Sequence, residues 1–485
     1  MEFNALLTVS TTVIATLAWI IWSRTKSISF LIGIGFLYYW SLFGAWFIVA
    51  DKLGGDSGMH YYDLERELFT IRLNGDYAWA LVLYSVFIIV VELVLLLLVK
   101  PEKFFTVRKA VPVELSHSRI LVIAALAGLL SFLIVKGSIA SAATLNLATY
   151  TGTRPETADV SPLFTLHQVL DRIALVAAGL GFVVWFCGNN ARLISGRSRR
   201  WTLIGYLLVL GGMSAFNFVL GNKSELLFAG LTGFLFYLAN STRPRILLVG
   251  SLAVVGVIAL GFVGLFRSVP LPSLYEAVKD VQLPDVVESL KYIASSNEAF
   301  AAHFSMYGAI SFHVPPTWGS SFVSLALSVV PRVFWPGRPN DIYFYYADRV
   351  GAEPGRGYTL LHATGWYLNF GTMGVVLGAL VLGWVWARSF NAYTSIRSST
   401  PSWSYALRVV TPWTFVAYFP AIVRAGIEVY KGVALEAFLI PSAVIALAFV
   451  KVPVSRAKLR PKILPTKVPP RVLETEVDKD GTHEQ

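Results

Sequence analysis

The chain has 485 residues, of which 55% are apolar and only 14% are charged, and its mean hydropathy is +0.62. Soluble domains keep about a quarter of their residues charged, so water cannot be this protein's only solvent. The formal net charge is +11, but the basic residues stand at the ends of apolar runs rather than on one face. These features exclude an ordinary soluble domain and argue against a nucleic-acid partner.

Local motifs exclude further classes of protein. The single cysteine, Cys187, lies within an apolar run, so disulfides within the chain and cysteine-based metal sites are excluded. The sequence lacks a P-loop, the phosphate-binding motif of ATP-driven transporters. The N-terminus has neither the charged head nor the cleavage site of a removable signal peptide, so we expect the first apolar run to remain as a span.

Apolar runs of about 20 residues, the length that crosses a bilayer, recur along the chain. They predict an all-α, polytopic membrane protein with about eleven transmembrane helices. The predicted spans are residues 5–23, 29–50, 77–99, 119–136, 169–188, 202–220, 225–241, 246–266, 359–387, 406–423 and 432–450.

The distribution of basic residues predicts how these spans are oriented. The loops after the first, third, fifth, seventh and ninth spans carry lysines and arginines, whereas the loops 51–76 and 137–168 also carry acids. Basic loops normally stay in the cytoplasm. We therefore expect the N-terminus outside and the C-terminus in the cytoplasm.

The chain then divides into four parts: residues 1–266 with spans one to eight, a large external loop at 267–358, residues 359–450 with spans nine to eleven, and a tail at 451–485. The tail begins with seven basic residues, five prolines and no acid over 451–471. This composition predicts a cytoplasmic segment lying against the membrane, followed by disorder.

The external loop is too long to be a simple connection. Residues Ser273–Gly308 have apolar positions at helical spacing, and Phe322–Val330 is apolar but too short to span. We expect amphipathic or re-entrant helices there. A proline-rich, aromatic and basic stretch follows from Pro331 to Pro339.

Several cationic side chains stand on the external side, where positive charge is normally disfavoured. A guanidinium group binds phosphate or diphosphate through two parallel hydrogen bonds, so these residues are candidates for binding a lipid diphosphate. Salt bridges with loop acids are the alternative, and we favour a functional role most for Arg338 and Arg356. The candidate cations are Arg267, Arg332, Arg338, Arg349, Arg356, Arg154, Lys223 and Arg424.

Two residues at external span ends are candidate proton acceptors. His362 stands at the start of the ninth span, and an imidazole can accept a proton near neutral pH. A packing or capping role is the alternative. Glu225 lies in the tight hairpin 221–225, and charge at membrane depth usually marks an aqueous cavity. A plain surface turn is the alternative there.

Two segments resemble the bacterial oligosaccharide repeat-unit polymerases, or O-antigen polymerases. Gly319–Pro339 contains an apolar stretch, then Pro331-Arg332, an aromatic residue and Pro336-Gly-Arg338-Pro339, as is frequent in that family. Gly365–Gly371 reads Gly-Trp-Tyr-Leu-Asn-Phe-Gly and is similar to the family's Tyr-x-Asn-Phe-Gly motif. The family tends to have an acidic or polar residue where this chain has Gly365, so any carboxylate role must fall elsewhere.

The resemblance implies a GT-C-like, inverting glycosyltransferase at the outer face of the bacterial cytoplasmic (inner) membrane, acting in lipopolysaccharide or related polysaccharide biosynthesis. Donor and acceptor would be oligosaccharides on undecaprenyl diphosphate, with no metal or other cofactor. Further partners would be membrane lipids, a chain-length regulator and a flippase. The implied catalytic residues are His362, Glu225, Arg338 and Arg356, and the implied substrate contacts are Lys223, Arg332, Arg424, Arg154, Arg267, Asn369 and Trp335.

Three other functions fit the same sequence. A structural partner would set the chain length without catalysis, and the large loop would then be a docking surface. A ligase of similar architecture would pass the glycan to another acceptor, such as a lipid A core. A transporter or flippase of lipid-linked sugars usually has internal duplication and broken helices. We find no clear duplication, and the charges that we singled out stand at the external side rather than at mid-membrane.

Overall fold

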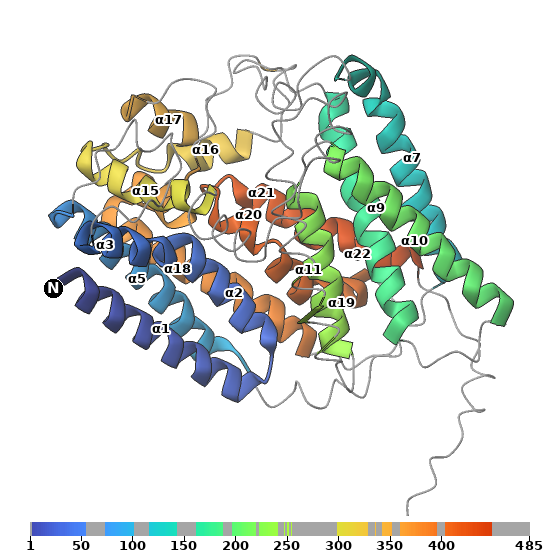
Figure 1. The fold of residues 1–485 in the computed structure, drawn as a ribbon, viewed down its shortest axis with the longest axis horizontal. Coiled ribbons are helices and arrows are strands. Elements are labelled where there is room, and N and C mark those ends of the chain that lie inside the picture. Colours follow the sequence, from blue (N-terminus) through green and yellow to red (C-terminus); the bar gives the residue numbers. More distant parts are fainter. Residues whose placement is uncertain are drawn as a thin grey trace, which may run out of the picture. The chain divides into compact units, whose positions relative to one another are not determined.

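The regular structure of the described residues is entirely helical (Figure 1). The computed structural model describes residues 2–54, 73–100, 116–142, 162–187, 196–219, 223–240, 298–327, 342–351, 359–394 and 403–448, and the single positions 247, 250, 251, 254 and 335. All of the long ranges belong to one compact unit, Met1–Phe449. The predicted tail lies outside the described residues.

Seven of the described helical segments are long and apolar enough to cross a membrane, which confirms a polytopic, all-α membrane protein. They correspond to predicted spans one to five, nine and eleven. Their bounds are Phe3–Thr25, Ile28–Val49, Gly75–Leu98, His117–Ile134, Leu166–Phe186, His362–Tyr393 and Val429–Ala448.

The other four predicted spans have different outcomes, so the number eleven stays a prediction. Predicted spans 202–220 and 225–241 form helices α10 (Gly196–Val219) and α11 (Lys223–Asn240), which are not among the seven segments found in the described residues, so their crossing of the membrane stays a prediction. The predicted span 406–423 is interrupted, as described below. The predicted span 246–266 lies almost wholly outside the described residues.

One group of helices contains the first three spans. Helix α1 (Glu2–Thr25) packs against α5 (Gly75–Leu98), and α5 packs against the long helix α18 (His362–Thr394). The second span consists of α2 (Ile28–Tyr38), the π-helical turn η1 (Tyr39–Phe43) and α3 (Gly44–Gly54). The side chain of Asn74 caps α5 by accepting a hydrogen bond from the backbone N–H of Tyr77 at 3.1 Å, which stabilises the helix start.

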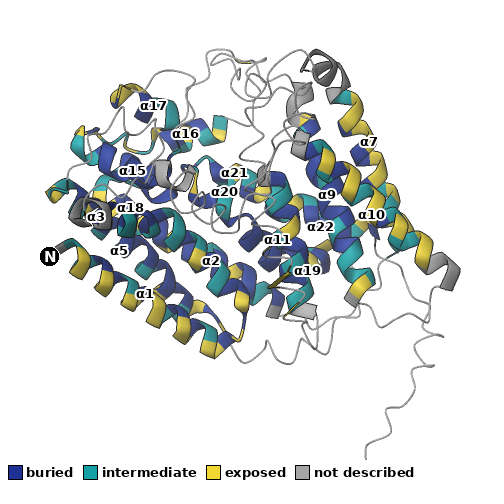
Figure 2. Ribbon diagram, viewed as in Figure 1, coloured by how far each residue is buried: buried dark blue, intermediate teal, exposed yellow. Residues whose placement is uncertain are grey.

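A second group of helices is formed by α7 (His117–Ala142), α9 (Pro162–Cys187), α10 and α11. Helix α9 contacts all three of the others. Its buried residues include Ala174, Ala177 and Ala178, and small side chains let membrane helices approach closely. Figure 2 shows many exposed positions along α1, α7 and α10. Large apolar side chains such as Leu129 and Leu208 are among them, as expected for faces that contact lipid.

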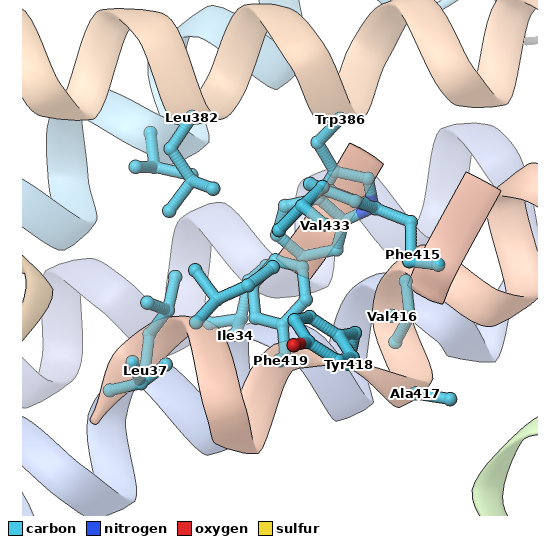
Figure 3. Close-up of a cluster of buried hydrophobic side chains, with 14 of the residues drawn as sticks. Ile34, Leu37, Leu382, Trp386, Phe415, Val416, Ala417, Tyr418, Phe419 and Val433 are labelled. Carbon is cyan, nitrogen blue, oxygen red and sulfur yellow. The ribbon is translucent and has the colours of Figure 1, made fainter. Parts of the chain in front are cut away.

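Trp386 of α18 belongs to the cluster of buried apolar side chains shown in Figure 3. Its ring centroid lies 4.5 Å from that of Phe419 in α20 (Phe419–Val423) and 5.3 Å from that of Phe30 in α2. Aromatic pairs at such distances stabilise a fold beyond the area that they bury. This cluster therefore holds the first group of helices to the C-terminal helices.

The C-terminal helices are broken at several points. Helix α18 has non-helical backbone at Phe370 and Gly371, where Gly371 has φ +61°, a conformation that glycine adopts readily. Helix α19 (Trp403–Ala417) ends before Tyr418, and α20 follows at once. The last span consists of α21 (Val429–Gly432), the π-helical η4 (Val433–Leu439) and α22 (Ile440–Ala448). Irregular backbone at membrane depth normally lines a cavity or is buried in protein.

The predicted external loop contains three described helices. Helix α15 (Glu298–Ser311) covers the end of the segment predicted from helical spacing, and α16 (Ser320–Leu327) overlaps the segment predicted to be re-entrant. Helix α17 (Ile342–Arg349) follows. Helix α15 packs on η1, α5 and α18. The loop is therefore joined to the membrane helices through α15.

Candidate functional site

His362, the first residue of α18, is enclosed by protein and only 1% exposed. Its Nδ1 lies 3.1 Å from the carbonyl oxygen of Ala425 and 3.3 Å from that of Gly426, so Nδ1 carries the hydrogen. Its Nε2 lies 2.9 Å from the Tyr430 hydroxyl and 3.2 Å from Trp366 Nε1, and it accepts from both. The neutral imidazole thus holds α18 to the segment between α20 and α21. A substrate would have to displace Tyr430 from Nε2 before His362 could act as a general base. That role stays a prediction.

Asn369 joins the two segments that resemble the polymerases. Its Oδ1 accepts hydrogen bonds from Thr317 Oγ1 at 3.1 Å and from Ser321 Oγ at 2.8 Å. Its Nδ2 donates to the Gly365 carbonyl at 2.7 Å. The backbone N–H of Trp318 also donates to the carbonyl of Asn369 at 2.9 Å. Three side-chain hydrogen bonds hold the amide within the protein, so the structure gives Asn369 a positioning role, and direct substrate contact stays a prediction.

Gly365 occupies a place where no larger side chain fits. A Cβ atom built there would lie 2.8 Å from Gly426 Cα, which is closer than real Cβ contacts allow. The start of α18 therefore packs directly on the backbone that His362 also contacts. This contact gives a physical reason why the chain lacks the acidic or polar residue of the resembling family at that point.

A buried cluster of charges lies where α9, α11 and η4 meet. Arg172 Nη2 lies 2.9 Å from Glu225 Oε1, and Arg172 Nη1 pairs with Glu436. The guanidinium carbon also lies 4.9 Å from the ring centre of Phe228 and 5.5 Å from that of Tyr418, which are favourable cation–π distances. One cation is therefore shared by two carboxylates at a largely water-free position.

Glu225, the second candidate base, belongs to this cluster. It lies in the first turn of α11 and is buried against Arg172. The guanidinium of Arg172 would compete with any substrate proton for that carboxylate. The structure thus shows a buried ion pair at Glu225 rather than the alternative of a plain surface turn, while the catalytic role stays a prediction.

The segment of α21 and η4 connects the two sets of contacts. Tyr430 in α21 hydrogen-bonds to His362, and Glu436 in η4 pairs with Arg172. About two helical turns separate these residues. π-Helical turns are frequent at functional sites. We therefore treat His362, Tyr430, Glu436, Arg172 and Glu225 as one candidate site.

Two charged residues of this site and the adjacent Asp171 were missed in the sequence. Asp171, Arg172 and Glu436 all lie inside predicted spans, at 169–188 and 432–450. The sequence did contain a signal for these residues, because charge inside an apolar span is rare and usually functional. The sequence could not indicate which of these charges meet.

The remaining predicted binding residues are only partly covered by the structure. Lys223 is the first residue of α11, Arg424 is exposed between α20 and α21, and Trp335 is exposed at an isolated position. The predicted diphosphate contacts at Arg154, Arg267, Arg332, Arg338 and Arg356 lie outside the described residues.

The described residues contain no group of three histidine, cysteine, aspartate or glutamate side chains that could hold a metal ion. Metal-independent chemistry stays a prediction.

Comparison with known proteins finds no relative of this chain. Neither a family model nor a characterised protein nor a solved structure is significantly similar to this chain.

Proposed function

We propose that this chain is an inverting membrane glycosyltransferase that lengthens a glycan on undecaprenyl diphosphate at the outer face of the bacterial cytoplasmic membrane. One observation carries the proposal. The two segments that resemble repeat-unit polymerases begin at Gly319 and Gly365, and the hydrogen bond from Ser321 to Asn369 joins them. Thr317 and Trp318, directly before the first segment, add further hydrogen bonds to the second. The two segments can act as one site only if the fold brings them this close together.

The chemistry follows from the charges that such a reaction develops. A hydroxyl of the acceptor sugar attacks the anomeric carbon of the donor, the bond from that carbon to the diphosphate oxygen breaks, and a base takes the hydroxyl proton. Negative charge grows on the leaving diphosphate, so positioned guanidinium groups stabilise the transition state more than the ground state. Arg338 and Arg356 are our first candidates for this role, and His362 and Glu225 are the candidate bases.

One observation favours a transporter of lipid-linked sugars as the second candidate function. Arg172, Glu225 and Glu436 form ion pairs inside the helix bundle, next to the broken helices α19, α20 and η4. Transporters commonly place charged residues and interrupted helices at their substrate sites. A ligase with a different acceptor would share the chemistry of the first candidate.

Reconstitution of the purified protein in liposomes with a lipid-linked repeat unit separates these functions. A polymerase lengthens the glycan without nucleotide, metal or a second protein. A transporter moves the repeat unit across the bilayer and leaves its length unchanged. Unchanged glycan length in sealed and in detergent-opened liposomes contradicts the proposal.

Matched arginine variants test the diphosphate contacts. We expect Arg338→Ala and Arg356→Ala to abolish chain growth while protein levels stay normal. Arg349→Ala is the control from the same loop, because the Arg349 guanidinium packs over Tyr345 at 5.5 Å and has a structural explanation. Long glycan from both test variants would rule out the proposed contacts.

A further inference from the structure

Asp171 and Asn217 leave two oxygen atoms without a partner in the interior of the helix bundle. Asp171 in α9 is 1% exposed and Asn217 in α10 is 0% exposed. Asp171 Oδ2 and Asn217 Oδ1 have no hydrogen-bond partner within the part of the chain that the structure describes. Buried oxygens normally have a donor, and an unpaired buried charge costs several kcal/mol or more.

The orientation of the Asn217 amide is fixed by its other contacts. Its Nδ2 donates to Asp171 Oδ1 at 2.8 Å and to the Met213 carbonyl at 3.0 Å. Turning the amide over would bring its oxygen against that carbonyl, which is unfavourable. Both amide hydrogens of Asn217 therefore already have acceptors, and the donor to Asn217 Oδ1 must be another group.

The charges around Asp171 disfavour another carboxylate. Arg172, the next residue of α9, is already shared between Glu225 of α11 and Glu436 of η4. The other titratable groups of the cluster are Tyr418 and His167, and His167 Nδ1 lies 2.8 Å from Ser131 Oγ in α7. With Asp171 ionised, three carboxylates would share one guanidinium.

We infer that Asp171 is a proton-binding site: at neutral pH it carries a proton on Oδ2, and Asn217 Oδ1 is the acceptor for that proton. A single proton then removes the buried negative charge and provides the donor that the site lacks. The acid and the amide form a reciprocal pair, since Asn217 donates to one oxygen of Asp171 and accepts from the other. This inference does not depend on the proposed transferase function.

Infrared spectroscopy of the full-length protein in liposomes tests the inference. We would label the carboxyl group of every aspartate with heavy carbon. A protonated carboxylic acid has a C=O band that is separate from the bands of ionised carboxylates, and the label shifts it. We expect one label-sensitive band at neutral pH in the wild type and its loss in Asp171→Asn. Glu92, which is buried with both oxygens unpartnered among the described residues, provides an internal control that the label does not shift.

Three results would overturn the inference. They are the absence of a label-sensitive band in the wild type, its persistence in Asp171→Asn, and its loss when sodium or potassium ions are added. The last result would mean that a metal cation, rather than a proton, lies between the two oxygens.

Thermal stability gives an independent readout. Asp171→Asn replaces the O–H donor by an N–H donor of similar size, so we expect a melting temperature close to that of the wild type. Asn217→Leu keeps the volume but removes both partners of the acid, so we expect a clear drop. A large drop for Asp171→Asn would show that the ionised carboxylate is the stabilising form.

Discussion

Arg172 illustrates how much a single buried charge depends on its partners. The guanidinium lies between Glu225 and Glu436 and over two aromatic rings. Removing one member of a buried ion pair leaves the others uncompensated, and the loss is typically about 3–5 kcal/mol. Substitutions in this cluster therefore test whether the charged side chains pack against one another as the structure shows.

We expect Arg172→Met to lower the melting temperature in detergent sharply, because two carboxylates are left without a cation. The triple variant Arg172→Met, Glu225→Gln, Glu436→Gln removes all three charges and should recover most of the stability. If the cluster serves function, this triple variant folds but is inactive. A normal melting temperature for Arg172→Met alone would contradict the ion pairs.

Gly365 is a second residue whose size matters. We expect Gly365→Ala to destabilise the protein by about 1–3 kcal/mol, as overpacking usually does, because the new methyl group would lie 2.8 Å from Gly426 Cα. The measurement is thermal unfolding in detergent. Gly35→Ala in α2 is the matched control, since nothing lies within 4 Å of a Cβ there, and it should be neutral or stabilising. Equal effects of the two variants would argue against the close contact.

At the scale of elements, α15 docks on the membrane helices through His303. Its Nδ1 donates to the Ser41 carbonyl of η1 at 2.6 Å, and its Nε2 accepts from the Tyr77 hydroxyl of α5 at 2.8 Å. Burial lowers the pKa of His303 to about 4, against an opposing effect of the hydrogen bond to Ser41. The imidazole is therefore neutral in the folded protein.

This docking predicts a pH dependence of stability. The unfolded chain protonates His303 below about pH 6.5, whereas the folded chain does so only near pH 4, so the folded state loses stability as the pH falls between these values. The loss from this residue is about 3 kcal/mol when complete. We expect His303→Gln, which can donate and accept at the same places, to flatten the melting profile over this window.

His313→Gln is the control, since His313 is exposed after α15, and its profile should keep the wild-type shape. Identical pH profiles of His303→Gln and the wild type would contradict the buried neutral imidazole.

At the scale of the whole molecule, orientation in the membrane is a prediction from basic residues alone. Cys187 is the only cysteine, so Cys187→Ser provides a cysteine-free background for labelling. We expect Lys26→Cys to be protected from a membrane-impermeant maleimide in intact cells, and His313→Cys to react. Both should react in opened membranes. The reverse pattern in intact cells would invert the topology and move the candidate site to the cytoplasmic side.

The sequence predicted several elements well for a simple reason. Membrane insertion depends on the summed hydropathy of about 20 consecutive residues, which is a local property. Segments such as Gly75–Leu98 therefore stand out directly. The sequence predicts the segment 406–423 as one span, but the break at Tyr418 divides it into α19 and α20. Hydropathy does not register such a break, because the broken segment remains apolar.

The sequence by itself determined that this is an all-α membrane protein and located most of its described spans. Only the tertiary structure decided which polar groups meet: Arg172 with Glu225 and Glu436, Asp171 with Asn217, and His362 with Tyr430. These partners come from different helices. Each contact depends on how the helices are rotated and packed against one another, which hydropathy along one segment does not specify.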